Sequence, residues 1–530
     1  MSRRALSWFI VCFVVVMVFG EGRAETPRSV FVMAKSLDDL ISLDPAEVFE
    51  FSGAEVIANL YQRLFRPNPD DPAKPIGDVV ETWAVSDDGL DFLFTLRPGL
   101  VFASGHPITA DDAVFSLHRA VALNKAPSFI LTQFGFTPDT VERLIRVVDE
   151  THFTLRLDRA FAPTLVLNAL SAGIASVVDR ATIEAADDAK WGHQWLRTHA
   201  AGSGGFTLRR WRAGEFLLLD VDPIQPGAPS ALKRVVIRDI REPATQRLLL
   251  ERGDIDMARN LGPDQVAALR GAPGVTILTA RRARLFYLGL NQRHPNLARP
   301  EVREAMRYLI DYRAIAETLL VGRATVHQAF LPRGFFGALE QTPFGFDPSR
   351  ARDLLAAAGL ADGFAVTMDT RSDPIALLVA QAIQATMGQA GIAIEIVPGN
   401  AKQVLTRYRA RKHDIFIGQW GPDYLDPHTN AATFARNPDN RDEAPERTLA
   451  WRNSWHIPDL TRLADAAVTE SDPARRGAIY ADLQRAVQAD SPFIVMFQEN
   501  ELIAMRDTVS GFKAGLTSDQ TLYRTIEKRR

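Results

Sequence analysis

The sequence predicts an α/β protein built on a mostly parallel sheet, and residues 346–420 support this most clearly. Asp347 and Pro348 are suited to begin a helix, and Gly359 is suited to end one. A strand is predicted from Phe364 to Met368, and a second helix follows it. Such alternation of helix and strand is typical of a parallel sheet with helices on its faces.

Two further strands complete this section. They are predicted from Ile392 to Val397 and from Asp414 to Gln419, with an amphipathic helix carrying Leu405 and Tyr408 between them. In open sheets of this kind, ligands bind beyond the carboxyl ends of the strands. Residues 420–427, which follow the last strand, therefore form a candidate binding loop.

Signals for a turn, a strand and a capped helix are concentrated between Trp83 and His118. Phe92 and Phe94 alternate with other residues at the period of a strand. Thr109 and Asp112 have the spacing of a capping box and stand before an apolar helical pattern. This run predicts a strand followed by a helix.

Composition excludes several functions. The chain has 530 residues, of which 46% are hydrophobic, so it is globular and too large for one ordinary core. Its net charge of −3 and the lack of a basic run give no footprint for nucleic acid or anionic lipid. Metal-ligand spacings, nucleotide-binding loops and nucleophile motifs are also missing from the sequence. We expect no enzyme activity, no metal and no cofactor.

The amino terminus predicts export. Arg3 and Arg4 precede an apolar run from Leu6 to Phe19. Gly22 and Ala24 then place small residues at the two positions that a signal peptidase reads. This pattern is typical of a cleaved signal peptide over residues 1–24, with an uncleaved anchor as the alternative. Cys12 lies inside the apolar run and away from the cleavage point, so a lipid anchor is not expected. The predicted location is the periplasm.

Four segments together resemble one protein family. Trp83–His118 resembles the signature of the extracytoplasmic solute-binding proteins, family 5, of ABC importers, which bind dipeptides, oligopeptides or nickel. Ser42–Pro45, Gly202–Phe206 and Trp420–Pro427 resemble further segments of that family, although Gly205 stands where proline is usual. The resemblance implies a two-lobed, type II periplasmic binding protein of the large peptide-binding subclass, with an extra subdomain in lobe one.

The resemblance also implies how the chain is divided. Strands near Arg284–Asn291 and Pro492–Gln498 are expected to cross between the lobes. The implied divisions are a signal peptide at 1–24, lobe one at 25–283 with an inserted subdomain at about 61–172, lobe two at 284–497, and a return to lobe one at 498–530.

The loop WGPDYLDP contains the first candidate for ligand binding. The resemblance implies that Asp423 receives the α-ammonium group of a peptide. A carboxylate facing an ammonium group in a closed cleft makes short, charge-assisted hydrogen bonds. Trp420 and Tyr424 could wall a side-chain pocket or simply pack the loop. Asp426 is expected to hold the turn.

Arg371 is the candidate for binding a ligand carboxylate. It follows a predicted strand and precedes a helix that begins near Pro374, so a guanidinium and free backbone N–H groups would lie together. The resemblance places an arginine of short-peptide binders in this neighbourhood. Arg436 and Arg452 are rival candidates.

Three other segments supply candidates. Ser203 and Gly204 are expected to offer backbone contacts to a ligand, as the resemblance implies. Phe49 and Phe51 could face the cleft or belong to the core. Trp451–Trp455, which contains Arg452 and Trp455, could select an aromatic or sugar-bearing ligand by stacking, or could pack between helices.

These observations predict a substrate-binding component of an ABC transporter that captures a peptide between two lobes and delivers it to a membrane permease. We expect a monomer with no direct membrane insertion. The alternative within the family is a non-peptide solute, such as an opine, a sugar conjugate, a nickel chelate or haem. A secreted hydrolase using Asp423 and Asp426 is an alternative from another class, and a periplasmic chaperone or signalling receptor is a third.

Overall fold

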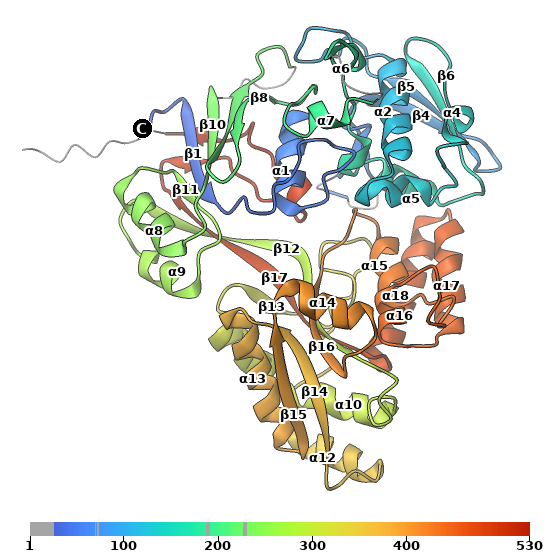
Figure 1. Cartoon of the computed structure of the whole chain (residues 1–530), viewed down its shortest axis with the longest axis vertical. Helices are drawn as coiled ribbons and strands as arrows, with labels where there is room; N and C mark the ends of the chain where they lie inside the picture. The colour runs from blue at the N-terminus through green and yellow to red at the C-terminus, as the bar shows by residue number, and fades with distance from the viewer. Residues whose placement is uncertain (1–25, 69, 72–73, 187–190, 226–230, 530) are drawn as a thin grey trace, which may run out of the picture.

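The computed structural model of the chain describes residues 26–68, 70–71, 74–186, 191–225 and 231–529. The predicted signal peptide lies outside the described residues. Figure 1 shows two lobes, one above the other, connected by two long strands, β12 (Val275–Leu290) and β17 (Phe493–Arg506). We call the elements before β12 and after β17 lobe one, and those between them lobe two.

One sheet of eleven strands extends through both lobes, in the order β15-β14-β16-β12-β17-β11-β1-β10-β9-β8, with β13 added beside β17. β12 and β17 are antiparallel over nearly their whole length, and a shift in register lies between Arg281 and Leu285. The strands predicted to cross between the lobes are therefore found, but each belongs to a longer strand. The exact division into 25–283, 284–497 and 498–530 remains a prediction.

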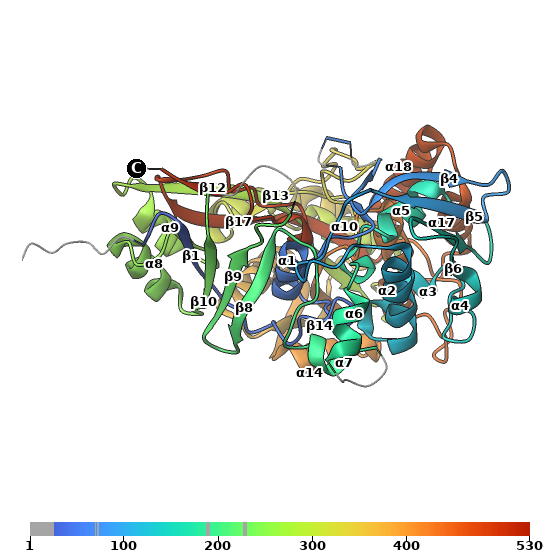
Figure 2. The same ribbon diagram turned by 90° about the horizontal axis from the view of Figure 1, so that it is seen from above.

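Lobe one holds the amino-terminal part of the sheet. Its elements outside the inserted subdomain are β1 (Val30–Lys35), α1 (Phe51–Leu60), α6 (Arg180–Ala185), α7 (His193–Leu196), β8 (Phe206–Arg212), β9 (Phe216–Val221), β10 (Arg234–Asp239), α8 (Pro243–Arg252), β11 (Met257–Ala258), α9 (Pro263–Leu269), β18 (Val509–Ser510), η4 (Ser518–Gln520) and β19 (Glu527–Lys528). Figure 2 shows α8 and α9 at the end of this lobe that is remote from the subdomain.

The inserted subdomain is built around a separate sheet, β4-β5-β7-β6. Its elements are β2 (Phe65–Arg66), β3 (Ile76–Gly77), β4 (Val80–Val85), β5 (Asp91–Leu96), α2 (Ala110–Leu123), η1 (Ala126–Ser128), α3 (Phe129–Thr132), α4 (Val141–Leu144), β6 (Ile145–Val147), β7 (His152–Arg156), α5 (Pro163–Ala169) and η2 (Gly173–Ala175). The predicted strand and helix are confirmed as β5 and α2. The capping box is also confirmed, because the backbone N–H of Asp112 donates to the hydroxyl of Thr109 and the backbone N–H of Thr109 donates to the carboxylate of Asp112.

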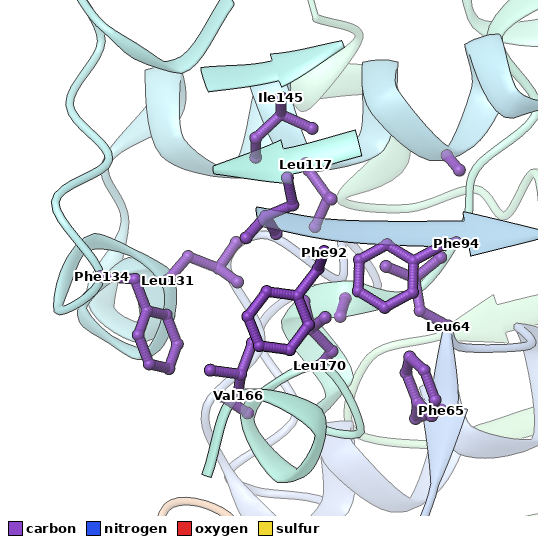
Figure 3. Packing of buried hydrophobic residues seen from close by; sticks show 14 of the residues in the cluster. Leu64, Phe65, Phe92, Phe94, Leu117, Leu131, Phe134, Ile145, Val166 and Leu170 are labelled. Atoms are coloured by element: carbon purple, nitrogen blue, oxygen red, sulfur yellow. The ribbon is translucent and has the colours of Figure 1, made fainter. Parts of the chain in front are cut away.

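This subdomain has its own hydrophobic core (Figure 3). Phe92 and Phe94 from β5 pack against Leu117 from α2 and Leu170 beyond α5, and all four are buried. Burial on this scale removes large apolar areas from water, which is the main stabilising contribution to a folded domain. The period-two pattern of the sequence therefore identified the buried face of the strand.

Lobe two contains the section whose alternation predicted the fold class. Its elements are α10 (Pro300–Tyr308), α11 (Tyr312–Ala314), η3 (Ile315–Leu319), β13 (Ala324–Val326), α12 (Pro348–Ala357), β14 (Phe364–Arg371), α13 (Pro374–Gly388), β15 (Ile392–Gly399), α14 (Ala401–Arg409), β16 (Ile415–Trp420), α15 (Pro427–Phe434), α16 (Leu449–Arg452), α17 (Pro458–Thr469) and α18 (Pro473–Ala489). The predicted strands and helices of residues 346–420 are confirmed, and β14 is parallel to both β15 and β16.

The lobes also touch away from β12 and β17. The backbone N–H of Ala162 in the subdomain donates to the carbonyl oxygen of Val468 at 2.7 Å. The hydroxyl of Tyr424 donates to the side-chain oxygen of Gln133 at 3.2 Å. Tyr424 and Val468, both from lobe two, belong to the hydrophobic core of the subdomain. The space between the lobes is thus bounded by the long strands on one side and by this contact on the other.

Candidate ligand-binding site

A cavity of about 570 Å³ lies between the lobes. Residues from both lobes and from the two long strands line it, at 35–39, 48–57, 171–174, 259–260, 282–284, 419–425, 499, 501 and 516–519. A cleft that joins two lobes and several chain segments is the usual position for a small-molecule site. We call it the interlobe cavity.

Asp423 lies on the lobe-two wall of the interlobe cavity, in the loop between β16 and α15. Its carboxylate accepts a hydrogen bond of 3.2 Å from the hydroxyl of Thr429. Burial raises the pKa of Asp423 to about 6, against the opposing effect of that hydrogen bond. No ion-pair partner of Asp423 is found within the described part of the chain. A positively charged ligand group would supply the missing counter-charge.

Asp426, in the same loop, is in the opposite situation. It is fully buried and forms a two-pronged ion pair with Arg476, with contacts of 2.6 and 2.8 Å. Burial opposes ionisation, but the guanidinium of Arg476 prevails and lowers the pKa of Asp426 below its usual value. The side-chain amide of Asn168 in the subdomain also donates to Asp426, at 3.3 Å. This carboxylate holds the loop and the lobe contact in place.

Aromatic side chains surround the approach to Asp423. Phe49 and Phe51 are 43% and 52% exposed and line the interlobe cavity, so they face the cleft and are not part of the core. The guanidinium of Arg284 lies 4.1 Å from the ring centroid of Phe51, a cation–π distance. Trp420 and Tyr424 line the same cavity from lobe two.

The opposite wall is a network of buried charges that the sequence did not reveal. Glu55 bonds Lys35 at 3.0 Å and Arg259 at 2.5 Å, and Glu501 bonds Arg259 at 2.6 Å and also Arg282. Burial raises the pKa of Glu55, but Arg259 outweighs this and lowers it to about 2. Three cations and two anions leave this network with a net charge of +1.

Arg371 lies outside the interlobe cavity and lines a second cavity of about 210 Å³. The two cavities share Arg284, Gln419 and Glu499 in their walls. Arg371 is exposed at the end of β14, and no ion pair to it is found among the described residues. Because β14 and β16 are parallel neighbours, their carboxyl ends place Arg371 and the Asp423 loop at the same edge of the sheet.

The rival arginines already have partners. Arg436 pairs with Asp465 at 2.7 Å and with Glu446. Arg452 donates to the carbonyl oxygen of Arg447 at 3.2 Å. Neither arginine lines the interlobe cavity.

Two predicted contact segments are placed behind the cavity walls. Ser203 is buried, and a side chain at Gly204 would lie 2.4 Å from the carbonyl oxygen of Asn59, so this turn packs tightly against the end of α1. Trp455 is buried against Phe493, with ring centroids 6.2 Å apart. Neither segment lines the interlobe cavity, and in both the observed contacts are internal packing.

Comparison with known proteins identifies the family of this chain. Residues 74–442 match the bacterial extracellular solute-binding proteins, family 5 (middle). The chain belongs to this family. A "Probable D,D-dipeptide-binding periplasmic protein DdpA" from Escherichia coli is 28% identical over 513 residues, which are 95% of each chain. A glutathione-binding protein GsiB from Salmonella typhi is 25% identical over 483 residues, or 89% of each chain.

Solved structures share the fold. The periplasmic binding protein DppA from Helicobacter pylori, in complex with the peptide STSA, has a TM-score of 0.76 at 22% identity, covering 94% of this chain and 98% of that one. The two-lobed fold is thus that of a periplasmic binding protein. Over the described residues, every helix is too short or too polar to cross a membrane. The same residues contain no cluster of three or more His, Cys, Asp or Glu side chains suited to a metal ion.

Proposed function

We propose that this protein is the periplasmic substrate-binding component of an ABC importer and that it binds a short peptide with a free amino terminus in the interlobe cavity. One observation carries the proposal: Asp423 is a carboxylate without an ion-pair partner among the described residues, on the wall of a cavity between two lobes. An ammonium group there forms a charge-assisted hydrogen bond that is stronger than the same bond in water.

In this proposal the carboxyl end of the peptide lies away from Asp423, in the second cavity. Arg371 and the neighbouring Arg323 line the second cavity, and their guanidinium groups suit two-pronged binding of a carboxylate. A ligand with opposite charges at its ends is therefore held in one orientation, with its amino end at Asp423. Side chains of the peptide lie between these anchors, near Phe49, Phe51 and Trp420.

The two curated relatives narrow the ligand class. One is named for binding D,D-dipeptides and the other for binding glutathione, a tripeptide. Both names refer to small peptides, and neither fixes the configuration of the residues bound here. We propose a di- or tripeptide as the ligand and leave its configuration to experiment.

Delivery requires a conformational change that a permease recognises. A ligand that touches Asp423 on lobe two and Phe51 on lobe one binds the closed form more tightly than the open form, and this difference shifts the equilibrium toward closure. The register shift of β12 near the crossing is a natural place for the lobes to pivot. We propose that the mature chain, after removal of residues 1–24, acts as a monomer.

A non-peptide solute is the competing proposal within this family. Stacking of an aromatic or sugar-bearing ligand on Trp451–Trp455 was its main support in the sequence. The ring of Trp451 is covered by Arg411 at 4.4 Å, and its Nε1 donates to the carbonyl oxygen of Arg441 at 2.7 Å. These side chains are engaged inside lobe two, so the observed contacts favour a peptide.

A thermal-shift screen tests the proposal. The mature protein is unfolded and refolded to remove carried ligand, then mixed with dipeptides in L,L and D,D configuration, with glutathione, and with amino-acetylated forms of each. Saturation at a hundred times Kd stabilises the folded state by about 2.7 kcal/mol. A shift with free peptides only is expected. A shift with sugars, opines or chelates and none with any peptide would overturn the proposal.

A further inference from the structure

The second cavity, which we call the apolar chamber, is built to hold a side chain. Its volume of about 210 Å³ is several times the ~30 Å³ that one water molecule occupies in the liquid. Phe286, Ile375, Val379, Leu405 and Met496 line it, and they come from β12, α13, α14 and β17. Walls supplied by two helices of lobe two and by the two long strands give the chamber a defined shape.

The apolar chamber adjoins the interlobe cavity. Arg284, Gln419 and Glu499 belong to the walls of both cavities. Arg284 and Glu499 form an ion pair of 3.2 Å there. A ligand that occupies both cavities therefore passes this ion pair.

The chamber lining also contains seven polar residues, five of them charged. Arg323 and Arg371 have no ion pair among the described residues. Asp373 is occupied as the N-cap of α13, where it accepts from the backbone N–H of Ala376 at 3.0 Å. Together with the Arg284–Glu499 pair, three cations and two anions give the lining a net charge of +1. A carboxylate is thus attracted to the cationic side chains of the lining, and an apolar group to its apolar side chains.

One buried hydroxyl in the chamber lacks a partner. Thr370, the second-last residue of β14, is fully buried, and its Oγ1 makes no hydrogen bond within the described residues. An unsatisfied buried hydroxyl costs free energy, so it marks a place where a ligand polar group completes the site. Its position beside Arg371 suits donation to a carboxylate.

We propose that the apolar chamber receives the side chain of the ligand's carboxyl-terminal residue and makes the protein selective for peptides that end in an apolar residue. This inference rests on the proposed peptide function and adds a specificity to it. Burying a leucine side chain, relative to leaving the chamber to water, favours binding by roughly tenfold to a hundredfold. Arg323, Arg371 and Thr370, which line the same chamber, then hold the carboxylate.

The test compares two dipeptides on one matched pair of variants. Ala-Leu is used in its L,L and D,D forms, and Ala-Gly in its L and D forms. Each dipeptide is titrated calorimetrically into the wild type, Ala376→Phe and Ala385→Phe. Ala376 lines the chamber, whereas Ala385 is exposed on the same helix. The larger ring at 376 fills the chamber, and the same change at 385 controls for the helix.

The expected result is that the wild type binds Ala-Leu at least roughly tenfold more tightly than Ala-Gly, by the burial of one leucine side chain. Ala376→Phe is expected to abolish this preference, because it weakens the binding of Ala-Leu at least roughly tenfold more than the binding of Ala-Gly. Ala385→Phe is expected to behave as the wild type. Val379→Ala, which enlarges the chamber, is expected to improve binding of Ala-Phe relative to Ala-Leu.

Three results would overturn the inference. Equal binding of both dipeptides to the wild type would show that the chamber does not select apolar side chains, although the protein binds peptides. An equal loss of both dipeptides in Ala376→Phe, with a normal melting temperature, would show that the chamber does not read the side chain. Binding of neither dipeptide, in either configuration, would overturn the peptide function and this inference together.

Discussion

The loop around Asp423 and the charge network around Glu55 face the same cavity, but the carboxylate of Asp423 lacks an ion-pair partner among the described residues and that of Glu55 has two. Burial raises the pKa of Asp423 to about 6. Glu55 is more deeply buried, yet Lys35 and Arg259 surround it and its pKa falls to about 2. A buried charge without a counter-charge destabilises the free protein, whereas a paired one maintains the fold.

This difference separates function from architecture within one cavity. The network joins α1, β12 and β17 through side chains that satisfy one another, so a ligand has little to add there. The carboxylate of Asp423 gains a partner only when a cation enters. Stability should therefore depend on the network, and affinity on the loop.

The largest expected effect comes from breaking the network. Glu501→Leu leaves Arg259 and Arg282 without one of their carboxylates, and loss of one partner from a buried ion pair costs about 3–5 kcal/mol. We expect a lower midpoint in urea denaturation and a lower melting temperature. Substitution of exposed Glu443 by leucine is the control. An unchanged midpoint would show that the network does not support the fold.

Asp423→Asn is expected to lower ligand affinity without lowering folding stability. Loss of a hydrogen bond to a charged group weakens binding by about 1.5–3 kcal/mol, or roughly tenfold to 150-fold. Folding stability at pH 7 should hold or rise, because the change removes a buried charge. Calorimetry and urea denaturation measure the two effects separately. A destabilised variant with normal affinity would reverse the roles assigned to the two regions.

The pH dependence of affinity sharpens the comparison. A bound ammonium favours ionised Asp423, so the complex holds fewer protons than the free protein. Affinity should be nearly constant between about pH 6.5 and 7.5 and fall by about tenfold per pH unit below the raised pKa of about 6. It should fall again above about pH 8, where the α-amino group of the peptide loses its proton. Asp423→Asn should not show the fall at low pH. A low-pH slope that the variant retains would assign the titration to another group.

Thr370→Val is expected to have the smallest effect. The variant keeps the shape of the side chain but removes the unpartnered hydroxyl, so folding stability should not fall. Peptide affinity should fall by about 1 kcal/mol, or about fivefold, since one hydrogen bond to the ligand is lost. The loss should be the same for Ala-Leu and Ala-Gly. No change in affinity would leave the hydroxyl without a role in binding.

Local signals explain which parts of the fold the sequence predicts. The cap at Asp347 and the strand and helix periods of residues 346–420 involve neighbours in the chain, and the observed elements agree with them. The loop after β16 could be identified because its residues are contiguous. The bonds of Arg259 to Glu55 and Glu501 join residues 204 and 242 positions apart, and no local pattern indicates them.

Long-range packing also explains why some predicted binding residues do not line the interlobe cavity. Ser203 and Gly204 form a recognisable segment, but its tight approach to α1 uses the glycine for packing. Trp455 is a prominent aromatic residue in the sequence, yet it is buried against β17. Whether a recognisable residue faces the cavity depends on how the lobes pack, and the sequence of one segment does not contain that information.

A double-mutant cycle between Asp423 and the amino group of the ligand tests directly whether this carboxylate binds the ammonium group. Wild type and Asp423→Asn are each titrated calorimetrically with the best-binding dipeptide and with its amino-acetylated form. Acetylation is expected to weaken binding to the wild type by about 1.5–3 kcal/mol and to have hardly any effect on binding to the variant. An equal loss on acetylation in both proteins would contradict this role of Asp423, because the ammonium group would then bind elsewhere.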